Sequence, residues 1–224
     1  MTRRGAAALL VGLTVASILG ACSSSDEATT TTTTRPRADA PVTTVPGAPP
    51  LAVVLGDSNI FAATREIEDA LAEAGLTPVV RGISGSGLKD NAIDWLPAAG
   101  AVVPARPPIV VVALGTNDAV FAPDVQAFQS RLDEFLAALG PLPVVWVTHT
   151  EGGGGRDPAD ERRVNDVIRA APTARPNVTV LDLAPLLAAR PDLLGEDRMH
   201  YSGRGREWFA QRIAAAADAN ASVS

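Results

Sequence analysis

The chain has 224 residues, and the roughly 170 that follow residue 50 are enough for one domain with a well-buried core. Its formal net charge is −6 and it contains no basic block, which argues against binding to nucleic acid. The single cysteine excludes an intrachain disulfide, and no Cys/His cluster has the spacing of a zinc site. We therefore expect neither a metal ion nor another cofactor.

The first 21 residues have the three parts of an export signal. Two arginines at positions 3 and 4 are followed by the apolar stretch Ala6 to Leu19, and small residues precede Cys22. Leu19-Gly20-Ala21-Cys22 resembles the lipobox of bacterial lipoproteins, in which the cysteine is lipidated and becomes the first residue of the mature protein. We expect lipidation, for example with palmitate, to hold the protein on the extracytoplasmic face of the cell membrane. An ordinary signal peptide and an uncleaved anchor stay open as alternatives.

Residues 22–50 are rich in Ser, Thr, Pro and Ala, and include a run of threonines from Thr29 to Thr34. Such a segment cannot bury enough apolar surface to fold. The sequence therefore predicts a signal peptide over 1–21, a flexible tether over 22–50 and one folded domain over 51–220.

From residue 51 onward, apolar runs typical of buried strands alternate with amphipathic stretches typical of helices. The predicted strands cover residues 51–55, 77–81, 109–114, 144–148 and 178–183. The predicted helices cover residues 59–74, 90–96, 125–139, 159–171 and 202–219. This alternation implies right-handed βαβ units, and so an α/β domain whose five-stranded parallel sheet carries helices on both faces.

Four polar blocks stand at the ends of these elements. They are Gly56-Asp57-Ser58-Asn59, the loop Gly82–Gly87, Gly115-Thr116-Asn117-Asp118 and Asp197-Arg198-Met199-His200. The first three follow the first three strands, and the fourth precedes the last helix. Because ligands of open α/β sheets bind outside the carboxyl ends of the strands, we expect the four blocks to converge at one edge.

Together the blocks resemble those of the SGNH, or GDSL-type, hydrolase superfamily, which is named for a serine, a glycine, an asparagine and a histidine. The resemblance spans about residues 51–219. It implies a three-layer α/β/α domain with a flavodoxin-like sheet that hydrolyses or transfers esters.

Each block then has a chemical role. A serine nucleophile needs a base, and the base needs an orienting group, which Ser58, His200 and Asp197 can supply. For the oxyanion, the resemblance implies three donors: the backbone N–H of Ser58, the N–H of Gly85 and the side-chain amide of Asn117. Gly82 and Gly87 stay open as alternatives to Gly85.

Structural interpretations of the same residues are also open. Ser58 can be a helix N-cap, Asp57 can bind turn amides, and Asn117 with Asp118 can form an Asx turn. His149, at the end of a predicted strand, either lines the site or is a polar strand-end residue. A dinucleotide site is excluded because the loop glycines have the reverse of the G-x-G-x-x-G spacing.

The sequence thus predicts a monomeric serine esterase that forms an acyl-enzyme without a cofactor. The expected partners are a small ester or acetylated glycan and, through the lipid on Cys22, a membrane. Small acyl groups are favoured because no long segment is available as a lid over a lipid chain. Two alternatives are an O-acyltransferase that delivers the acyl group to a glycan and a binding module without catalysis.

Overall fold

A computed structural model describes residues 41–43, 47, 49–88, 93–121 and 124–221. The predicted signal peptide, Cys22 and most of the predicted tether lie outside the described residues. Within the described part of the chain, no helix is both long and apolar enough to cross a membrane.

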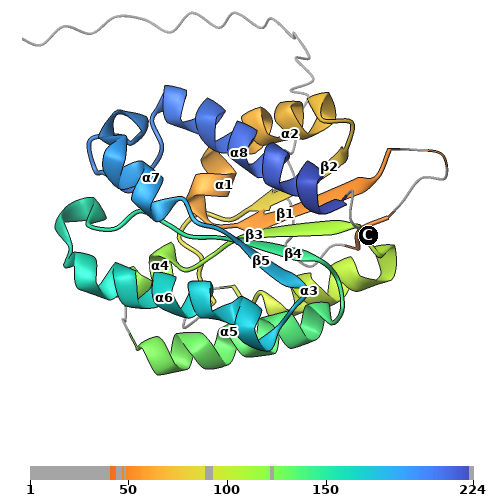
Figure 1. Ribbon diagram of the computed structural model, residues 1–224, viewed down its shortest axis with the longest axis horizontal. Coiled ribbons are helices and arrows are strands. Elements are labelled where there is room, and N and C mark those ends of the chain that lie inside the picture. Colours follow the sequence, from red (N-terminus) through yellow and green to blue (C-terminus); the bar gives the residue numbers. More distant parts are fainter. Residues whose placement is uncertain (1–40, 44–46, 48, 89–92, 122–123, 222–224) are drawn as a thin grey trace, which may run out of the picture. The chain divides into compact units, whose positions relative to one another are not determined.

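The domain is built on a five-stranded parallel sheet in the order β2-β1-β3-β4-β5 (Figure 1). Its strands are β1 (Leu51–Gly56), β2 (Thr77–Gly82), β3 (Ile109–Ala113), β4 (Val144–Val147) and β5 (Val178–Leu181). This confirms the predicted α/β class, and each strand lies within two residues of its predicted bounds. The strand order reverses between β1 and β3, which is where doubly wound sheets bind their ligands.

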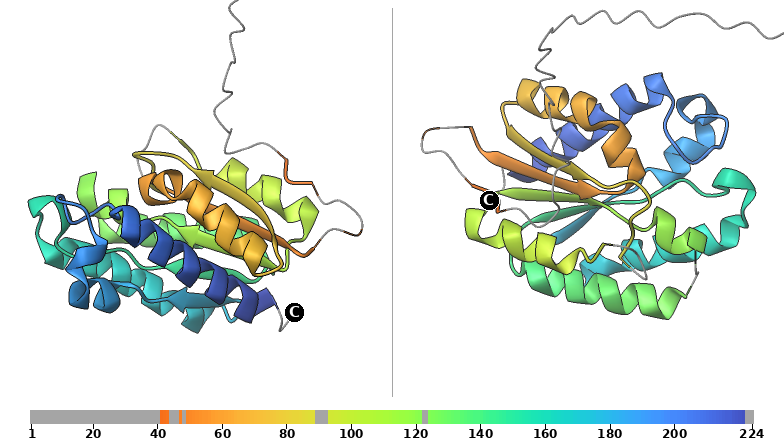
Figure 2. Two further views of the ribbon diagram at one scale, coloured as in Figure 1. Left: turned by 90° about the horizontal axis from the view of Figure 1, so that it is seen from above. Right: turned by 180° about the vertical axis from the view of Figure 1, so that it is seen from behind.

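Helices cover both faces of the sheet, giving three layers (Figures 1 and 2). One face carries α1 (Ser58–Ala62), α2 (Thr64–Glu73), α7 (Ala184–Ala189) and α8 (Gly203–Ala221). The other carries α3 (Leu96–Val102), α4 (Thr116–Phe121), α5 (Val125–Leu139) and α6 (Pro158–Ala174). Three short 3₁₀ turns complete the fold: η1 (Val103–Ala105), η2 (Gly153–Gly155) and η3 (Pro191–Leu193).

The sequence of β1, which lies between β2 and β3, is apolar without alternation because both of its faces are covered. Val53 and Leu55 pack into the core beneath α3 and α5, whereas Ala52 and Val54 pack into the core beneath α2 and α8. All four side chains have no exposed surface. Burying a Val or Leu side chain contributes about 1.5–3 kcal/mol, so both layers hold this strand in the middle of the domain.

Two predicted helices differ from the structure. The helix predicted over 59–74 is interrupted at Ala63, where the Thr64 hydroxyl donates to the carbonyl groups of Ile60 and Phe61. A local bond of this kind competes with regular helix hydrogen bonding.

The helix predicted over 90–96 is wrong for residues 93–95, because α3 begins only at Leu96. There the Asp94 side chain accepts the Leu96 N–H, and Pro97 occupies the first turn. Both features are typical of helix starts.

Candidate active site

Ser58 stands at the carboxyl end of β1 as the first residue of α1, and its side chain is half-buried. The preceding Asp57 is the N-cap, and its Oδ1 accepts the Asn59 N–H at 2.9 Å. Gly56 must lack a side chain, since a Cβ there would lie 2.8 Å from the Ala113 carbonyl oxygen on β3. The capping chemistry thus belongs to Asp57, and the Ser58 hydroxyl is left to face the site.

His200 and Asp197 lie in the loop between η3 and α8. The His200 ring donates its Nδ1–H to Asp197 Oδ2 at 2.6 Å, while Asp197 Oδ1 accepts the backbone N–H groups of Met199 and His200 at 3.0 Å. Arg198 turns the chain between them with a left-handed φ of 54°. Burial alone would raise the pKa of Asp197, but the hydrogen bonds from His200 and Met199 lower it to about 2.

The structure brings Ser58 and His200 together across 142 positions of sequence, with Oγ and Nε2 2.9 Å apart. Because Nδ1–H is donated to Asp197, Nε2 is the nitrogen that accepts the Ser58 hydroxyl hydrogen. Ser58, His200 and Asp197 therefore form a continuous hydrogen-bonded chain. The side chains of His200 and Asp197 are 39% and 43% exposed, so solvent reaches this hydrogen-bonded group.

The third block opens the helix α4 and does not form an isolated turn. Asn117 donates its side-chain amide to the carbonyl oxygen of Ser86 at 2.7 Å, and Asp118 Oδ2 accepts the Leu88 N–H at 3.0 Å. Gly85 precedes Ser86 in this loop, with an exposed backbone and a φ of +76°. The two side chains that open α4 thus fix the loop after β2.

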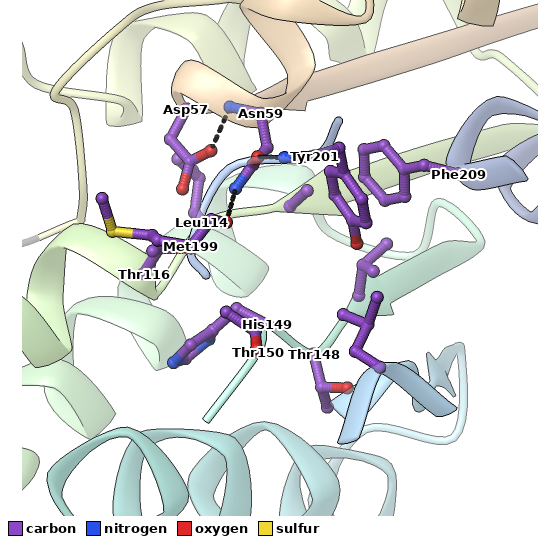
Figure 3. A pocket seen from close by; sticks show the side chains of 13 residues that line it. Asp57, Asn59, Leu114, Thr116, Thr148, His149, Thr150, Met199, Tyr201 and Phe209 are labelled. Atoms are coloured by element: carbon purple, nitrogen blue, oxygen red, sulfur yellow. Dashed lines mark hydrogen bonds between the residues drawn. The ribbon is translucent and has the colours of Figure 1, made fainter. Parts of the chain in front are cut away.

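Asn59 is a site residue to which the sequence pointed only as a neighbour of Ser58. Its amide bridges two backbone groups of the loop that carries His200, donating to the Met199 carbonyl and accepting the Tyr201 N–H, both at 3.4 Å (Figure 3). These two backbone groups flank His200 on either side. Asn59 therefore couples the position of His200 to the helix that carries Ser58.

A second support for the loop that carries Asp197 and His200 is the glycine-rich segment after β4. Gly154 donates its N–H to the Asp197 carbonyl at 2.6 Å, and a Cβ on Gly153 would lie 2.8 Å from the Arg198 carbonyl oxygen. Buried Glu161 of α6 accepts the N–H groups of Gly152 and Gly153. Burial raises the pKa of Glu161, and these two backbone bonds oppose that rise. The sequence marks this segment only as a loop, since nothing local shows what it packs against.

A cavity of about 20 Å³ lies beside the candidate active site and is lined by Asp57, Asn59, Thr116, His149 and Tyr201, among others (Figure 3). It is about the size of one water molecule or one methyl group. Burial lowers the pKa of His149 to about 3, with a smaller contribution from the charge of Arg169. His149 thus lines the cavity as a neutral imidazole at pH 7.

Burial has the opposite effect on Asp57 and raises the pKa of its carboxyl group to about 6. The Asn59 N–H and the nearby Thr116 hydroxyl oppose this rise, but Oδ2 has no hydrogen bond of ordinary geometry from any described residue. Asp57 therefore sits at the base of the site as a carboxylate that is costly to ionise. Among the residues that the structure describes, no group of three or more His, Cys, Asp or Glu is placed to hold a metal ion.

Known proteins resemble this chain in sequence pattern and in fold. Residues 54–208 match the model of the GDSL-like Lipase/Acylhydrolase family. The comparison with curated proteins found no match. Among solved structures, the chain is similar to a lipase/acylhydrolase from Enterococcus faecalis, with a TM-score of 0.65 and 20% identity over 76% of this chain and 96% of that one.

Two further structures share the fold. The C-terminal catalytic domain of peptidoglycan O-acetyltransferase A from Streptococcus pneumoniae has a TM-score of 0.59 and 19% identity, over 79% of this chain and 97% of that one. A variant of an acetyl-xylooligosaccharide esterase from a Geobacillus has a TM-score of 0.54 and 18% identity, over 75% of this chain and 93% of that one.

Proposed function

Because the chain belongs to the GDSL-like lipase/acylhydrolase family, which acts on ester bonds, we propose that it is a serine esterase in which Ser58 is the nucleophile. The observation that carries this proposal is the hydrogen-bonded chain from Ser58 Oγ through the His200 ring to Asp197, with distances of 2.9 and 2.6 Å. A hydroxyl is a weak nucleophile at neutral pH, and a base at this distance activates it.

In the first half of the reaction, Ser58 Oγ attacks the ester carbonyl while its proton passes to His200 Nε2. Asp197 stabilises the imidazolium that forms, through the bond from Nδ1–H. His200 then returns the proton to the leaving alcohol oxygen, and the acyl group stays on Ser58. In the second half, water attacks the acyl-enzyme while its proton passes to His200 Nε2. His200 then gives this proton to Ser58 Oγ as the acyl–Oγ bond breaks and the acid leaves.

The tetrahedral intermediates carry a negative oxygen that needs donors. We assign these to the N–H groups of Ser58 and Gly85 and to the second N–H of the Asn117 amide, whose first N–H is engaged by Ser86. The Asn117–Ser86 bond supports this assignment, because it holds the Gly85 loop next to the helix that carries Asn117.

The substrate that fits best is a small acyl ester such as an acetyl group on a glycan. Because His200 and Asp197 are partly exposed, they can reach an ester carried on a large solvated molecule. The adjacent cavity of about 20 Å³ has room for little more than a methyl group. The similar fold of an O-acetyltransferase catalytic domain favours one alternative, in which a sugar hydroxyl replaces water as the acyl acceptor.

We further propose that lipidation of Cys22 holds the enzyme at the extracytoplasmic face of the cell membrane, as its lipobox-like sequence suggests. Replacing Cys22 with Ala should abolish lipid labelling and release the protein from the membrane fraction. A Cys22→Ala protein that still carries the lipid label would refute the anchor.

The esterase proposal is tested with p-nitrophenyl acetate. The purified protein should cleave it, and Ser58→Ala should lower the rate by about 10³-fold or more. The matched control is Ser130→Ala, which removes an exposed hydroxyl on α5 and should leave the rate unchanged. Equal rates for the Ser58→Ala and unaltered proteins would refute the proposal. Repeating the assay with and without a glycan acceptor separates hydrolysis from acyl transfer.

A further inference from the structure

The side chain of Arg156, just after η2, lies against the loop that carries the catalytic histidine. Its Nη1 donates to the Met199 sulfur at 3.1 Å, and a Cβ built on Gly154 would lie 3.5 Å from its guanidinium carbon. Gly154 in turn donates its N–H to the Asp197 carbonyl at 2.6 Å. The guanidinium therefore lies next to Met199 and to Gly154, which is itself bonded to Asp197.

The partner of this guanidinium is weak for a group of its kind. A thioether sulfur is a poor acceptor, whereas the planar fork of arginine matches the two oxygens of a carboxylate or phosphate. Among the described residues, Arg131 and Arg169 each pair with acidic side chains, but Arg156 forms no ion pair. Burial raises the pKa of nearby Glu161 and the charge of Arg156 opposes that rise, but the Glu161 carboxylate accepts its hydrogen bonds from the backbone N–H groups of Gly152 and Gly153.

The contact with Met199 places this donor beside the loop that carries His200. Arg156 is half-buried, so its charge is only partly screened by water. Met199, which it contacts, is adjacent to His200 in the chain and lines the cavity beside Asp57 and Thr116. A bound ester with a negative group near its scissile bond would bring that group toward the guanidinium.

We propose that Arg156 binds an anionic oxygen group, a carboxylate or a phosphate, on the substrate of this enzyme. This inference rests on the proposed esterase function, since it deepens the description of the same site. It predicts a preference for charged over neutral esters in a chain whose net charge of −6 would otherwise repel anions.

The kinetic test compares kcat/KM for 4-acetoxybenzoate with kcat/KM for its neutral methyl ester. Arg156→Gln should lower this ratio about tenfold, and Arg156→Lys, which keeps the charge but loses the fork, about two- to fivefold. The control Arg162→Gln removes an exposed arginine from α6 and should leave the ratio unchanged. The same comparison between 4-acetoxyphenyl phosphate and phenyl acetate tells whether phosphate or carboxylate is preferred.

A binding measurement separates this inference from the esterase proposal. Ser58→Ala protein is titrated with 4-acetoxybenzoate and with its methyl ester by NMR, with and without Arg156→Gln. If the acid binds through Arg156 although no ester is hydrolysed, the anion site stands and the esterase proposal falls. If esters are hydrolysed but neither the ratio nor the binding depends on Arg156, the anion site is overturned and the esterase stands. Should Arg156→Gln fail to fold, an unchanged ratio in Arg156→Lys also overturns it.

Discussion

The side-chain amide of Asn117 donates a hydrogen bond to the carbonyl oxygen of Ser86 at 2.7 Å, which ties the first turn of α4 to the loop after β2. The side-chain amide nitrogen of Asn carries two hydrogens in a fixed plane. The bond to Ser86 uses one of them and so fixes the direction of the second. The loop that it holds contains Gly85, the second proposed oxyanion donor. Asn117 thus positions two of the three proposed donors, itself and the Gly85 loop.

Replacing Asn117 with Ala should therefore lower kcat by about 10²–10³-fold, since one donor is lost and the loop of another is released. Steady-state kinetics with p-nitrophenyl acetate measure the effect. The control is Asn177→Ala, which removes an amide that donates to the Gly140 and Leu142 carbonyls near the start of β5. That variant should lose stability but keep its kcat, and an equal loss of kcat in both would contradict the oxyanion role.

Asn59 should matter for catalysis without touching the substrate carbonyl. Asn59→Leu has a similar volume but cannot bridge Met199 and Tyr201, so His200 loses its alignment with Ser58. A small misplacement of a catalytic group can cost about 10²-fold, and we expect kcat to fall by up to that factor with little change in KM. A kcat equal to that of the unaltered protein would show that the loop holds His200 without this bridge.

Asp57 should make the stability of the protein depend on pH. Its pKa rises from 3.8 to about 6 on folding, so the folded state binds the extra proton between these values and stability falls as pH rises through that window. The full loss is roughly 3 kcal/mol at neutral pH. Asp57→Asn keeps an acceptor for the Asn59 N–H but cannot ionise, and should remove this dependence.

Urea unfolding of both proteins at pH 4, 5, 6 and 7 measures this effect as the difference in unfolding free energy. The difference should grow in favour of Asp57→Asn up to about pH 6 and then level off. The lowered pKa of Asp197 affects stability only below about pH 4, where its contribution is lost as pH falls. The lowered pKa of His149 does affect stability within this window, but equally in both proteins, so it cancels from the difference. A difference independent of pH would mean that Asp57 is already ionised at no cost.

Two glycines in the first turn of α8 give a matched stability test. A Cβ on Gly205 would overlap the carbonyl group of Leu193, whereas one on Gly203 meets nothing within 4 Å. Gly205→Ala should cost about 1–3 kcal/mol of unfolding free energy, and Gly203→Ala should be neutral or stabilising by up to about 1 kcal/mol. Thermal and urea unfolding report both. Equal effects would mean that η3 can move away from α8.

The sheet and the candidate site differ in how well the sequence predicts them. The apolar runs of β1 and β3 predict buried strands because burial on both faces demands such runs, and each strand is confirmed within two residues. The six-residue helices α4 and α7 are missed because they are too short to show a helical period. The break at Ala63 is missed because the helical spacing of Ile60, Ala63 and Ile67 continues across it.

The sequence by itself determined the α/β class, the four polar blocks and the family resemblance that links Ser58, Asn117 and His200, because these follow from local patterns and spacing. Only the tertiary structure decided which groups hold these residues in place. Asn59 bonds the backbone before and after His200, the Ser86 carbonyl accepts from Asn117, and the Gly154 N–H donates to the Asp197 carbonyl. These contacts join segments up to 140 or so positions apart, and all but the Gly154 bond use a side chain whose partner is a backbone group. Backbone N–H and carbonyl groups are the same in nearly every residue type, so the sequence does not show which of them a side chain will bond.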